Sequence, residues 1–507
     1  MKFDEPLPTG WALTFCSDFC SGRNETFNPA KAGEEEFVLY SVPSHETGKP
    51  EIVRASEIGS NKQFVSAGDT LISKINPRLN RTWVVGRHPG KQIIASTEWI
   101  VFSRSPAFIP QFLAYFLQQG VVRDFLSHNA SGVGGSLTRV RASIFEQVPL
   151  PLPPLAEQKR IVAKIEELFS ELEAGEESLR VARRQLGVYR QSLLKQAFEG
   201  KLTAQWRTQN PAKPESPAQL LARIQAARQA YYEEQLKDWE AAVKTWESAG
   251  QKGKRPAKPS EPASFASKEF KGLEVPEGWA VEQIGNCPTD ALIGLVRSAD
   301  VQHAGPAGFR YIKMDRVDMQ GNTDLETDVF VDCTPEEVAR FSLRKGDILF
   351  NTRNSVELVG KVGIVRRAPE TSTVYNNNLM VLRLSDCLDP LFVGLQLCAQ
   401  PFRQRMEKVK KATTSVAAVY GKDFWPLPVV LCSLPEQQEI VRLLDAQFEV
   451  IERNEREIDA ALKRSEALRQ AILKKAFTGR LVSQDPTDEP ASELLARLRA
   501  DRPGPKR

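Results

Sequence analysis

Two long segments of the chain carry a helical pattern of apolar positions. Within residues 155–202 and again within 434–481, apolar side chains recur at three- and four-residue steps between charged ones. Glycine stands near the end of each segment, at Gly200 and Gly479, where helices commonly stop. About 40 residues at ~1.5 Å rise per residue make a rod of ~60 Å. The pattern therefore predicts two long helices.

The two predicted helices are copies of each other. Leu155–Leu202 aligns with Leu434–Leu481 without a gap, and about a third of the aligned positions are identical. The copies end in QAFEGKL and KAFTGRL. The repeat is wider than the helices, because LPTGW near the N-terminus returns as VPEGW at 275–279, and a proline-spaced apolar stretch precedes each helix. The chain thus consists of two halves with the same order of segments.

A rod with a single apolar stripe needs a partner. One reading is a general coiled coil that oligomerises through the stripe. The other is that the two copies pack on each other, antiparallel, inside one chain. We favour the second, because tethering raises the effective concentration of one helix around the other.

Each helix follows a globular block with the signals of a mixed α/β fold. Short β-branched and aromatic runs bounded by turn residues predict strands at 37–42, 69–75, 83–87 and 99–103, and a helix at 110–119. FRYIKM, GDILF, KVGIVRR, NLMVLRL and PLFVGLQLCAQ are their counterparts in the second block. The expected divisions are a first block at 1–150, a long helix at 151–202, a helical extension and flexible linker at 203–270, a second block at 271–430, a second long helix at 431–482, and a tail with a short helix at 483–507.

The extension at 203–270 belongs to the repeat. Its LLARI at Leu220–Ile224 is mirrored by LLARL at Leu494–Leu498. It reads either as a spacer to the second block or as an added docking surface. We favour the spacer, while Trp239 and Trp246 on a charged helix keep docking open.

The composition of the chain limits the number of domains and the class of protein to which it can belong. A chain of 507 residues predicts about three or four domains. No run approaches the ~20 apolar residues of a membrane span, and the N-terminus lacks the apolar stretch of a signal peptide. Seven scattered cysteines predict reduced thiols in the cytoplasm and no zinc site. The net charge of +4 is small, so any basic surface must arise from local clustering.

Catalytic motifs are missing from the sequence. We find neither the N-P-P-[YF] signature of amino-methyltransferases nor a phosphate loop. GVGGS at Gly132–Ser136 lacks a lysine at the right spacing and reads as a flexible turn. Asp69 and Asp347 sit in Gly-Asp turns before strands, where turn capping is the expected role. We expect no catalytic residues and no metal ligands.

Two unlike globular blocks, each followed by a repeated helix that begins LxEQ and closes AF.G.L, resemble the DNA-specificity subunit of type I restriction–modification systems. The resemblance covers essentially the whole chain. It implies that the blocks are target-recognition domains, each reading half of a split site in double-stranded DNA. The fold it implies is two α/β recognition domains separated by two long helices that pack as an antiparallel coiled coil, with a pseudo-twofold internal repeat.

The resemblance also implies partners. The repeated helices would space the blocks and dock two modification (methyltransferase) subunits, and restriction subunits would join through the complex. No cofactor would bind to this chain, because S-adenosylmethionine, ATP and Mg²⁺ are used by the partner subunits. The repeat ends carry the docking residues that it implies: Glu157, Gln158, Phe198, Gly200, Leu202, Glu436, Gln437, Phe477, Gly479 and Leu481.

DNA readout needs Arg, Lys, Asn, Ser or Thr presented to a groove. In each block, small polar residues followed by a basic one stand just before the proline stretch. Further basic clusters lie upstream, one in the first block at 73–81 and two in the second at 351–355 and 360–367. An ordinary solvated loop is the alternative for each. The candidates in the first block are Lys74, Arg78, Arg81, Ser136, Thr138, Arg139 and Arg141. Those in the second are Arg353, Asn354, Lys361, Arg366, Thr413, Thr414, Ser415 and Lys422.

Two other classes of function stay open at this point. A coiled-coil adaptor would use the helices without touching DNA. A fused nuclease–methyltransferase component would own the chemistry, and the missing motifs argue against it.

Overall fold

The computed structural model describes residues 6–19, 26–132, 138–210, 215–251, 253, 255–266, 270, 272–305, 307–413 and 416–500. The chain divides into two compact units, residues 1–181 with 457–507 and residues 182–456. Each unit holds one globular block and one half of each long helix, and each is described by itself. Among the helices in the described ranges, none is long and apolar enough to cross a membrane.

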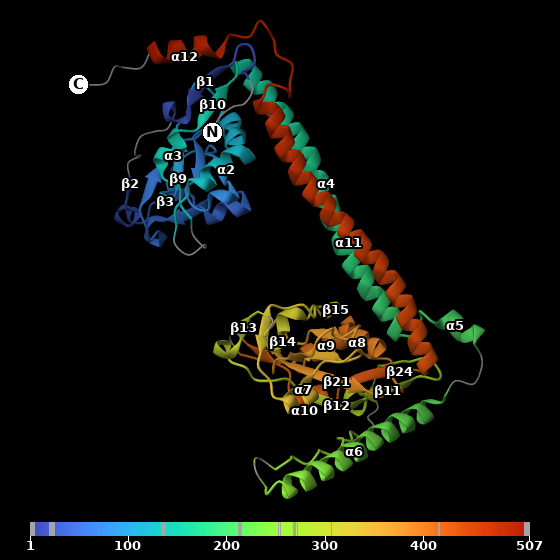
Figure 1. The fold of residues 1–507 in the computed structure, drawn as a ribbon. Helices are drawn as coiled ribbons and strands as arrows, with labels where there is room; N and C mark the ends of the chain where they lie inside the picture. Colours follow the sequence, from blue (N-terminus) through green and yellow to red (C-terminus); the bar gives the residue numbers. More distant parts are fainter. Residues whose placement is uncertain are drawn as a thin grey trace. The chain divides into compact units, whose positions relative to one another are not determined.

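The two long helices are α4 (Leu155–Phe198) and α11 (Leu434–Phe477), each 44 residues long (Figure 1). Their limits confirm the prediction from the apolar pattern. Part of the apolar stripe of each helix packs on the other helix and is therefore removed from solvent.

The helices pair antiparallel within the chain. In the first unit, the guanidinium of Arg469 on α11 lies 5.0 Å from the ring centroid of Phe169 on α4, and its Nε donates to Glu176 across 3.3 Å. In the second unit, the guanidinium of Arg190 on α4 lies 3.8 Å from the ring centroid of Phe448 on α11. Arg190 and Arg469 are copies of each other in the repeat. The first half of α4 thus meets the second half of α11 and the reverse, which confirms the intramolecular pairing.

The first unit contains a mixed sheet of order β2-β5-β8-β3-β4, a three-stranded sheet of order β7-β6-β9, and the pair β1-β10. Among the described strands of this unit, only β3 and β8 run parallel. The elements are β1 (Ala12–Phe15), β2 (Thr26–Phe27), β3 (Glu36–Tyr40), β4 (Glu51–Arg54), β5 (Lys62–Phe64), β6 (Thr70–Ser73), β7 (Thr82–Val84), β8 (Gln92–Ser96), β9 (Trp99–Phe102), α1 (Pro110–Leu117), α2 (Gly120–His128), α3 (Ala142–Glu146), β10 (Pro149–Leu152) and α12 (Ala491–Ala500).

The second unit contains sheets of order β12-β21-β17-β19-β15, β13-β16-β14-β20 and β18-β23-β22, and the pair β11-β24. Its elements are α5 (Ala204–Gln209), α6 (Pro217–Ser248), β11 (Ala280–Gln283), β12 (Pro288–Ile293), β13 (His303–Ala304), β14 (Phe309–Ile312), β15 (Gly321–Asn322), β16 (Val329–Val331), α7 (Pro335–Phe341), β17 (Ile348–Asn351), β18 (Arg353–Asn354), β19 (Val362–Ile364), β20 (Thr373–Tyr375), β21 (Leu379–Leu384), α8 (Pro390–Cys398), α9 (Gln400–Glu407), β22 (Lys411–Ala412), β23 (Ala417–Ala418), α10 (Gly421–Phe424) and β24 (Pro428–Leu431).

The repeated Gly-Asp turns open equivalent strands, β6 and β17. Asp69 accepts hydrogen bonds from the backbone N–H groups of Ser66 (2.8 Å) and Arg104 (2.9 Å). Asp347 accepts one from the backbone N–H of Arg344 (2.9 Å). Turn capping, expected from the sequence, is confirmed at both positions.

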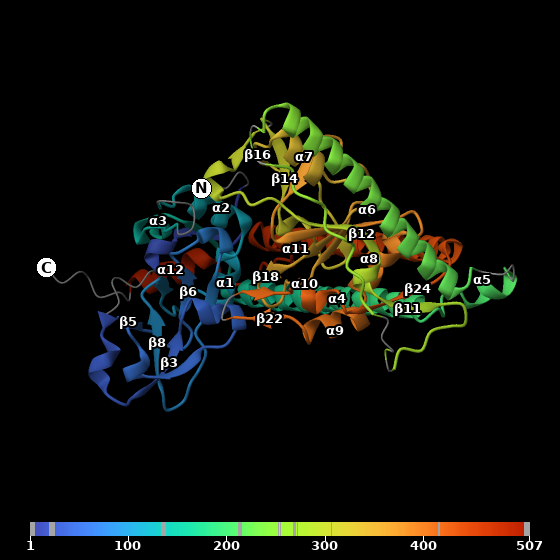
Figure 2. The ribbon, with the colours of Figure 1, turned by 90° about the horizontal axis from the view of Figure 1, so that it is seen from below.

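The extension folds onto the second block. Leu220 and Ile224 at the start of α6 are buried in the core of the second unit, and α6 lies along β12 (Figure 2). Leu494 and Leu495 of α12 are buried in the first unit, so the mirrored LLAR motifs have mirrored roles. The indole N–H groups of Trp239 and Trp246 donate to the carbonyls of Pro256 (3.1 Å) and Gly253 (3.2 Å). Both tryptophans therefore hold the returning linker against α6.

Candidate nucleic-acid interface

Two of the three candidate DNA-reading clusters of the second block, residues 351–355 and 408–424, form one β-ribbon. β23 lies between β22 and β18, both of them antiparallel to it, with Ala418 opposite Lys411 on one side and opposite Arg353 on the other. The N–H of Val419 extends the ribbon by donating to the carbonyl of Thr352 across 2.9 Å. β18, β22 and α10 are labelled in Figure 2. Segments some 60 residues apart in the sequence are thus joined.

The first block builds the same ribbon from shorter bridges. Arg139 pairs with Ile75 on one side and with Ser131 on the other. The N–H of Val140 donates to the carbonyl of Lys74 (2.9 Å), the counterpart of the bond between Val419 and Thr352. The sequence placed these clusters in equivalent positions along the chain but gave no signal that they pair.

The candidates of the first block differ in exposure and in whether their side chains have partners within the chain. Arg139 forms a bidentate pair with Glu98, Arg81 donates to Glu46 (2.8 Å), and the ammonium of Lys74 donates to the carbonyl of Thr97 (2.6 Å). Arg78 and Arg141 are exposed, and Thr138 is half-buried with its N–H on the side chain of Asn76. Ser136 lies outside the described residues.

In the second block, Arg353 and Lys422 are exposed, and Asn354 donates to the side chain of Asn351 across 2.9 Å. The N–H and hydroxyl of Thr413 both reach the carbonyl of Val416, at 2.8 and 2.9 Å, and so hold the base of the hairpin between β22 and β23. Thr414 and Ser415 lie outside the described residues. DNA contact by any of these candidates stays a prediction.

Two candidates of the second block have structural roles in the free chain. Lys361 is buried, and its ammonium donates to the carbonyl of Met314 across 2.7 Å. Burial lowers the pKa of this lysine. Arg366 pairs with Asp445 on α11 at 2.9 Å, away from the ribbon. Neither side chain can enter a groove without giving up its partner.

The residues at the start of each repeat form a latch between block and helix. The indole N–H of Trp11 donates to Glu157 (3.0 Å) in the first unit, and that of Trp279 donates to Glu436 (3.1 Å) in the second. All four side chains are buried. The repeated Pro-x-Gly-Trp and Glu-Gln motifs were the available signal, but the sequence did not say that they touch.

The glutamine that follows each glutamate ties the helix to the block's own helix start. Gln158 accepts from the N–H of Ile109 across 3.0 Å, just before α1. Gln437 accepts from the N–H of Asp389 across 2.8 Å, just before α8. Both glutamines are fully buried. These polar side chains satisfy helix N-terminal donors that would otherwise lack partners.

The closing motif of each helix packs on a block as well. The ring of Phe477 lies 5.1 Å from that of Phe112, and the ring of Phe198 lies 5.4 Å from that of Phe392. Gly200 and Gly479 adopt positive φ and contact prolines of the Pro-x-Gly-Trp segments. Leu202 and Leu481 are half-buried beside them. The residues implied as docking sites thus form intramolecular joints, and subunit docking through them remains untested.

The two latches differ in one respect. Glu436 has further partners, accepting from the hydroxyl of Thr203 (2.7 Å) and from the guanidinium of Arg207 (2.5 Å). The repeat aligns Thr203 with Val482, so that hydroxyl has no counterpart in the first unit. Oε1 of Glu157 has no hydrogen-bond partner among the described residues, and burial raises the pKa of this carboxyl.

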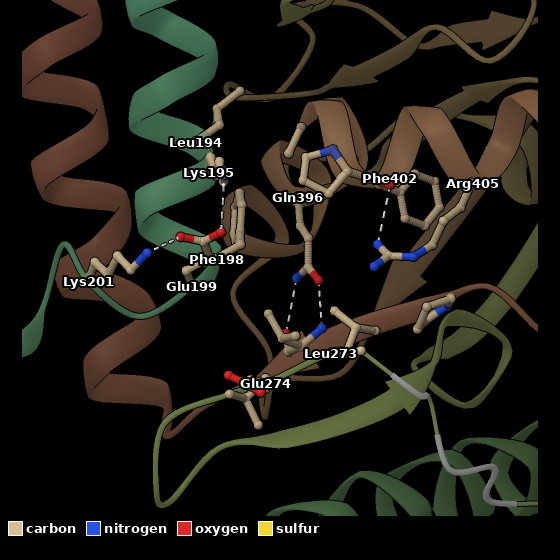
Figure 3. Close-up of a pocket in the computed structure, with 16 residues that line it drawn as sticks. Leu194, Lys195, Phe198, Glu199, Lys201, Leu273, Glu274, Gln396, Phe402 and Arg405 are labelled. Carbon is tan, nitrogen blue, oxygen red and sulfur yellow. Dashed lines mark hydrogen bonds and ion pairs between the residues drawn. The ribbon is translucent and has the colours of Figure 1, made fainter.

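A cavity of about 510 Å³ lies beside the joint of the second unit (Figure 3). Residues from the end of α4, from α8 and α9, and from 272–275 line it. Gln396 is bound to both backbone groups of Val430, and Glu199 pairs with Lys201 at 2.6 Å (Figure 3). Within the described part of the chain, no group of three or more His, Cys, Asp or Glu side chains could hold a metal ion.

The chain matches one protein-family model and several known proteins. The model of the type I restriction modification DNA specificity domain matches residues 9–180 and 310–464. The EcoKI specificity subunit of Escherichia coli K12 is 24% identical over 404 residues, which cover 77% of this chain and 71% of that protein. The EcoDI specificity subunit of Escherichia coli is 38% identical over 201 residues, 38% of this chain and 44% of its own.

A chain from a solved structure of a type I R-M system is similar in fold. It aligns with 94% of this chain and 100% of its own length, with a TM-score of 0.64 and 20% identity. The matched residues of the family model take in both ribbons and most of both long helices. The chain therefore belongs to the type I restriction modification DNA specificity family.

Proposed function

We propose that this chain is the subunit that gives a type I restriction–modification complex its DNA sequence specificity. It reads a split, asymmetric site in double-stranded DNA, with one half-site for each globular block. The observation that carries the proposal is the pair of ribbons, which are built from equivalent segments but carry different exposed side chains. Equivalent scaffolds with unlike surfaces suit two unlike half-sites.

Two modification subunits dock on the long helices, one for each repeat. Because the repeat ends are buried in intramolecular joints, we assign docking to the apolar side chains that α4 and α11 leave exposed. Val188 is 73% exposed on α4, and Leu468 and Val450 are 49% and 46% exposed on α11. Exposed apolar side chains on a packed helix pair are typical of a partner surface.

The chemistry belongs to the partners. The modification subunits transfer methyl groups from S-adenosylmethionine, and the restriction subunits use ATP and Mg²⁺ to translocate and cut DNA. This chain contributes no catalytic residue and supplies position alone. The complex acts on DNA in the cytoplasm.

Coexpression with the modification subunit tests the proposal. The purified complex should contain two modification subunits per chain by light scattering, and should shift duplexes that carry the methylated motif in preference to scrambled ones. A complex that binds all duplexes alike, or a chain that ignores the modification subunit, would contradict it.

A further inference from the structure

The ribbon of the second block has one buried face and one exposed face. Side chains alternate between the faces of a strand, so Val416, Ala418 and Tyr420 share one side, while Ala417 and Val419 share the other. Ala417 and Val419 are 0% and 3% exposed, whereas Val416 and Tyr420 are 44% and 48% exposed. Val416 and Tyr420 are therefore nearly half exposed, on either side of Ala418, which is 9% exposed.

Cations flank this apolar pair. Residues directly opposite each other in an antiparallel ladder place their side chains on the same face. Arg353 on β18 and Lys411 on β22 both lie opposite Ala418 and so share the exposed face. The ammonium of Lys411 lies 6.0 Å from the ring centroid of Tyr420 and 3.6 Å from Asp423. The face has an aromatic and aliphatic centre with one cation on each outer strand.

The first block carries different residues at the same places. Arg139 occupies the central position of Ala418, and Arg141 that of Tyr420. Arg141 and Tyr420 are both the residue before a short helix, α3 or α10, with extended backbone at φ −74° and −90°. One scaffold position thus presents a cation in one block and an aromatic ring in the other.

The major groove of DNA admits a two-stranded β-ribbon, such as the pair of β22 and β23. The floor of the groove offers one apolar group, the C5 methyl of thymine. Arginine suits guanine or phosphate, while aliphatic and aromatic side chains suit that methyl. With the ribbon in the groove, the cations on its outer strands would face the phosphates that border it.

Resting on the proposed function, we propose that Tyr420 and Val416 are specificity-determining residues that contact a thymine methyl in the major groove of the second half-site. Arg353 and Lys411 hold the ribbon there through phosphates. The second half-site therefore contains at least one A·T pair that is read through its methyl group.

Deoxyuridine, which is thymidine without the C5 methyl, is the probe. The complex of the full chain with its modification subunit is titrated with duplexes in which each thymine of the methylated motif is replaced in turn. Replacement of one thymine in the second half-site should weaken binding roughly four-fold, the value of burying one methyl-sized group. Tyr420→Ala should bind thymine and deoxyuridine duplexes equally, and Tyr420→Phe should keep the discrimination. Arg141→Ala, the matched position of the first block, should keep it too.

Salt dependence separates the cations from the apolar pair. Lys411→Ala and Arg353→Ala should each reduce the slope of log affinity against log salt by about one, because each removes a phosphate contact. Tyr420→Ala should leave the slope unchanged. Tyr420 is exposed, and circular dichroism of the variant should match that of the unmodified complex.

The outcomes are distinguishable. A complex without any sequence preference would remove the proposed function and this inference with it. A specific complex whose second half-site lacks thymine, or that ignores every deoxyuridine, would overturn the inference alone. The same holds if Tyr420→Ala retains the methyl discrimination, and if its effect is equal on all sequences.

Discussion

Trp279 donates its indole N–H to Glu436 across 3.1 Å, linking the opening segment of the second block to the start of α11. The same bond joins Trp11 to Glu157. Because Glu436 also pairs with Arg207 while Oε1 of Glu157 lacks a partner among the described residues, the copies should respond differently to one substitution.

Glu436→Gln should destabilise the second unit by about 2 kcal/mol, because it removes a charged hydrogen bond in a buried site and leaves Arg207 without its carboxylate. Glu157→Gln should change the free energy of unfolding by less than about 1 kcal/mol, because an amide keeps an acceptor for Trp11 and removes a buried acid. Urea denaturation of both variants measures the difference. Equal losses would contradict the asymmetry between the latches.

The stability that Glu157 contributes to the first unit should be greater at low pH than at high pH. Burial raises the pKa of Glu157 above its ordinary value of 4.5, so the folded chain binds more protons than the unfolded chain in that window. This contribution to stability is full below the unfolded pKa and is lost as the pH rises through the folded pKa. The hydrogen bond from Trp11 and the charge of Arg160 oppose this rise in pKa, and the charge of Asp488 adds to it. The stability difference between the unmodified chain and Glu157→Gln, measured from pH 4 to pH 8, should therefore favour the unmodified chain at low pH. A difference independent of pH would be evidence against it.

Two glycines, Gly187 within α4 and Gly200 just after its end, should respond oppositely to alanine. Gly200 has φ +68°, and an added Cβ would lie 2.3 Å from Cγ of Pro276. Gly200→Ala should therefore destabilise the chain by about 1–3 kcal/mol. Nothing lies within 4 Å of an added Cβ at Gly187 in mid-helix, so Gly187→Ala should stabilise the chain by about 1 kcal/mol. Thermal denaturation compares the two, and the same sign for both would refute the assignment.

Docking should depend on the exposed apolar side chains of the long helices. Val188→Glu combined with Val450→Glu should abolish capture of the modification subunit while leaving the melting temperature within a few degrees, since the two side chains are already 73% and 46% exposed. Ile52→Glu is the matched control, because Ile52 is 62% exposed but lies on β4. Copurification measures capture. Retained capture in the double variant would move the docking surface elsewhere.

Much of the secondary structure could be predicted, because it follows from the spacing of apolar residues along the chain. The apolar steps of 155–202 and 434–481 predicted α4 and α11, and β-branched runs predicted strands such as β3 and β9. Tertiary pairing was not readable in the same way. Lys361 lies in a basic cluster of the sequence, yet its partner is a carbonyl of a residue 47 positions away.

The exposed face of the second block's ribbon could not be predicted from the sequence either. Tyr420 was absent from the candidates because single-sequence reasoning selects charged and polar residues for DNA contact. Its exposure follows from the register of β23 between two strands, which only the fold defines. In the repeat ends, sequence identity between the copies signalled a shared role but did not distinguish an internal joint from a subunit interface.

The central claim is that each block reads its own half of the site, and methylome sequencing tests it most directly. Hosts carry the modification subunit with the unmodified chain, with Arg141→Ala, or with Tyr420→Ala. The unmodified chain should give one motif of two unlike half-sites separated by a fixed number of ignored bases. Arg141→Ala should relax or weaken only the first half-site, and Tyr420→Ala should relax only the second, because the loss of a base contact relaxes specificity locally. A continuous or palindromic motif, or two variants that alter the same half-site, would contradict the account.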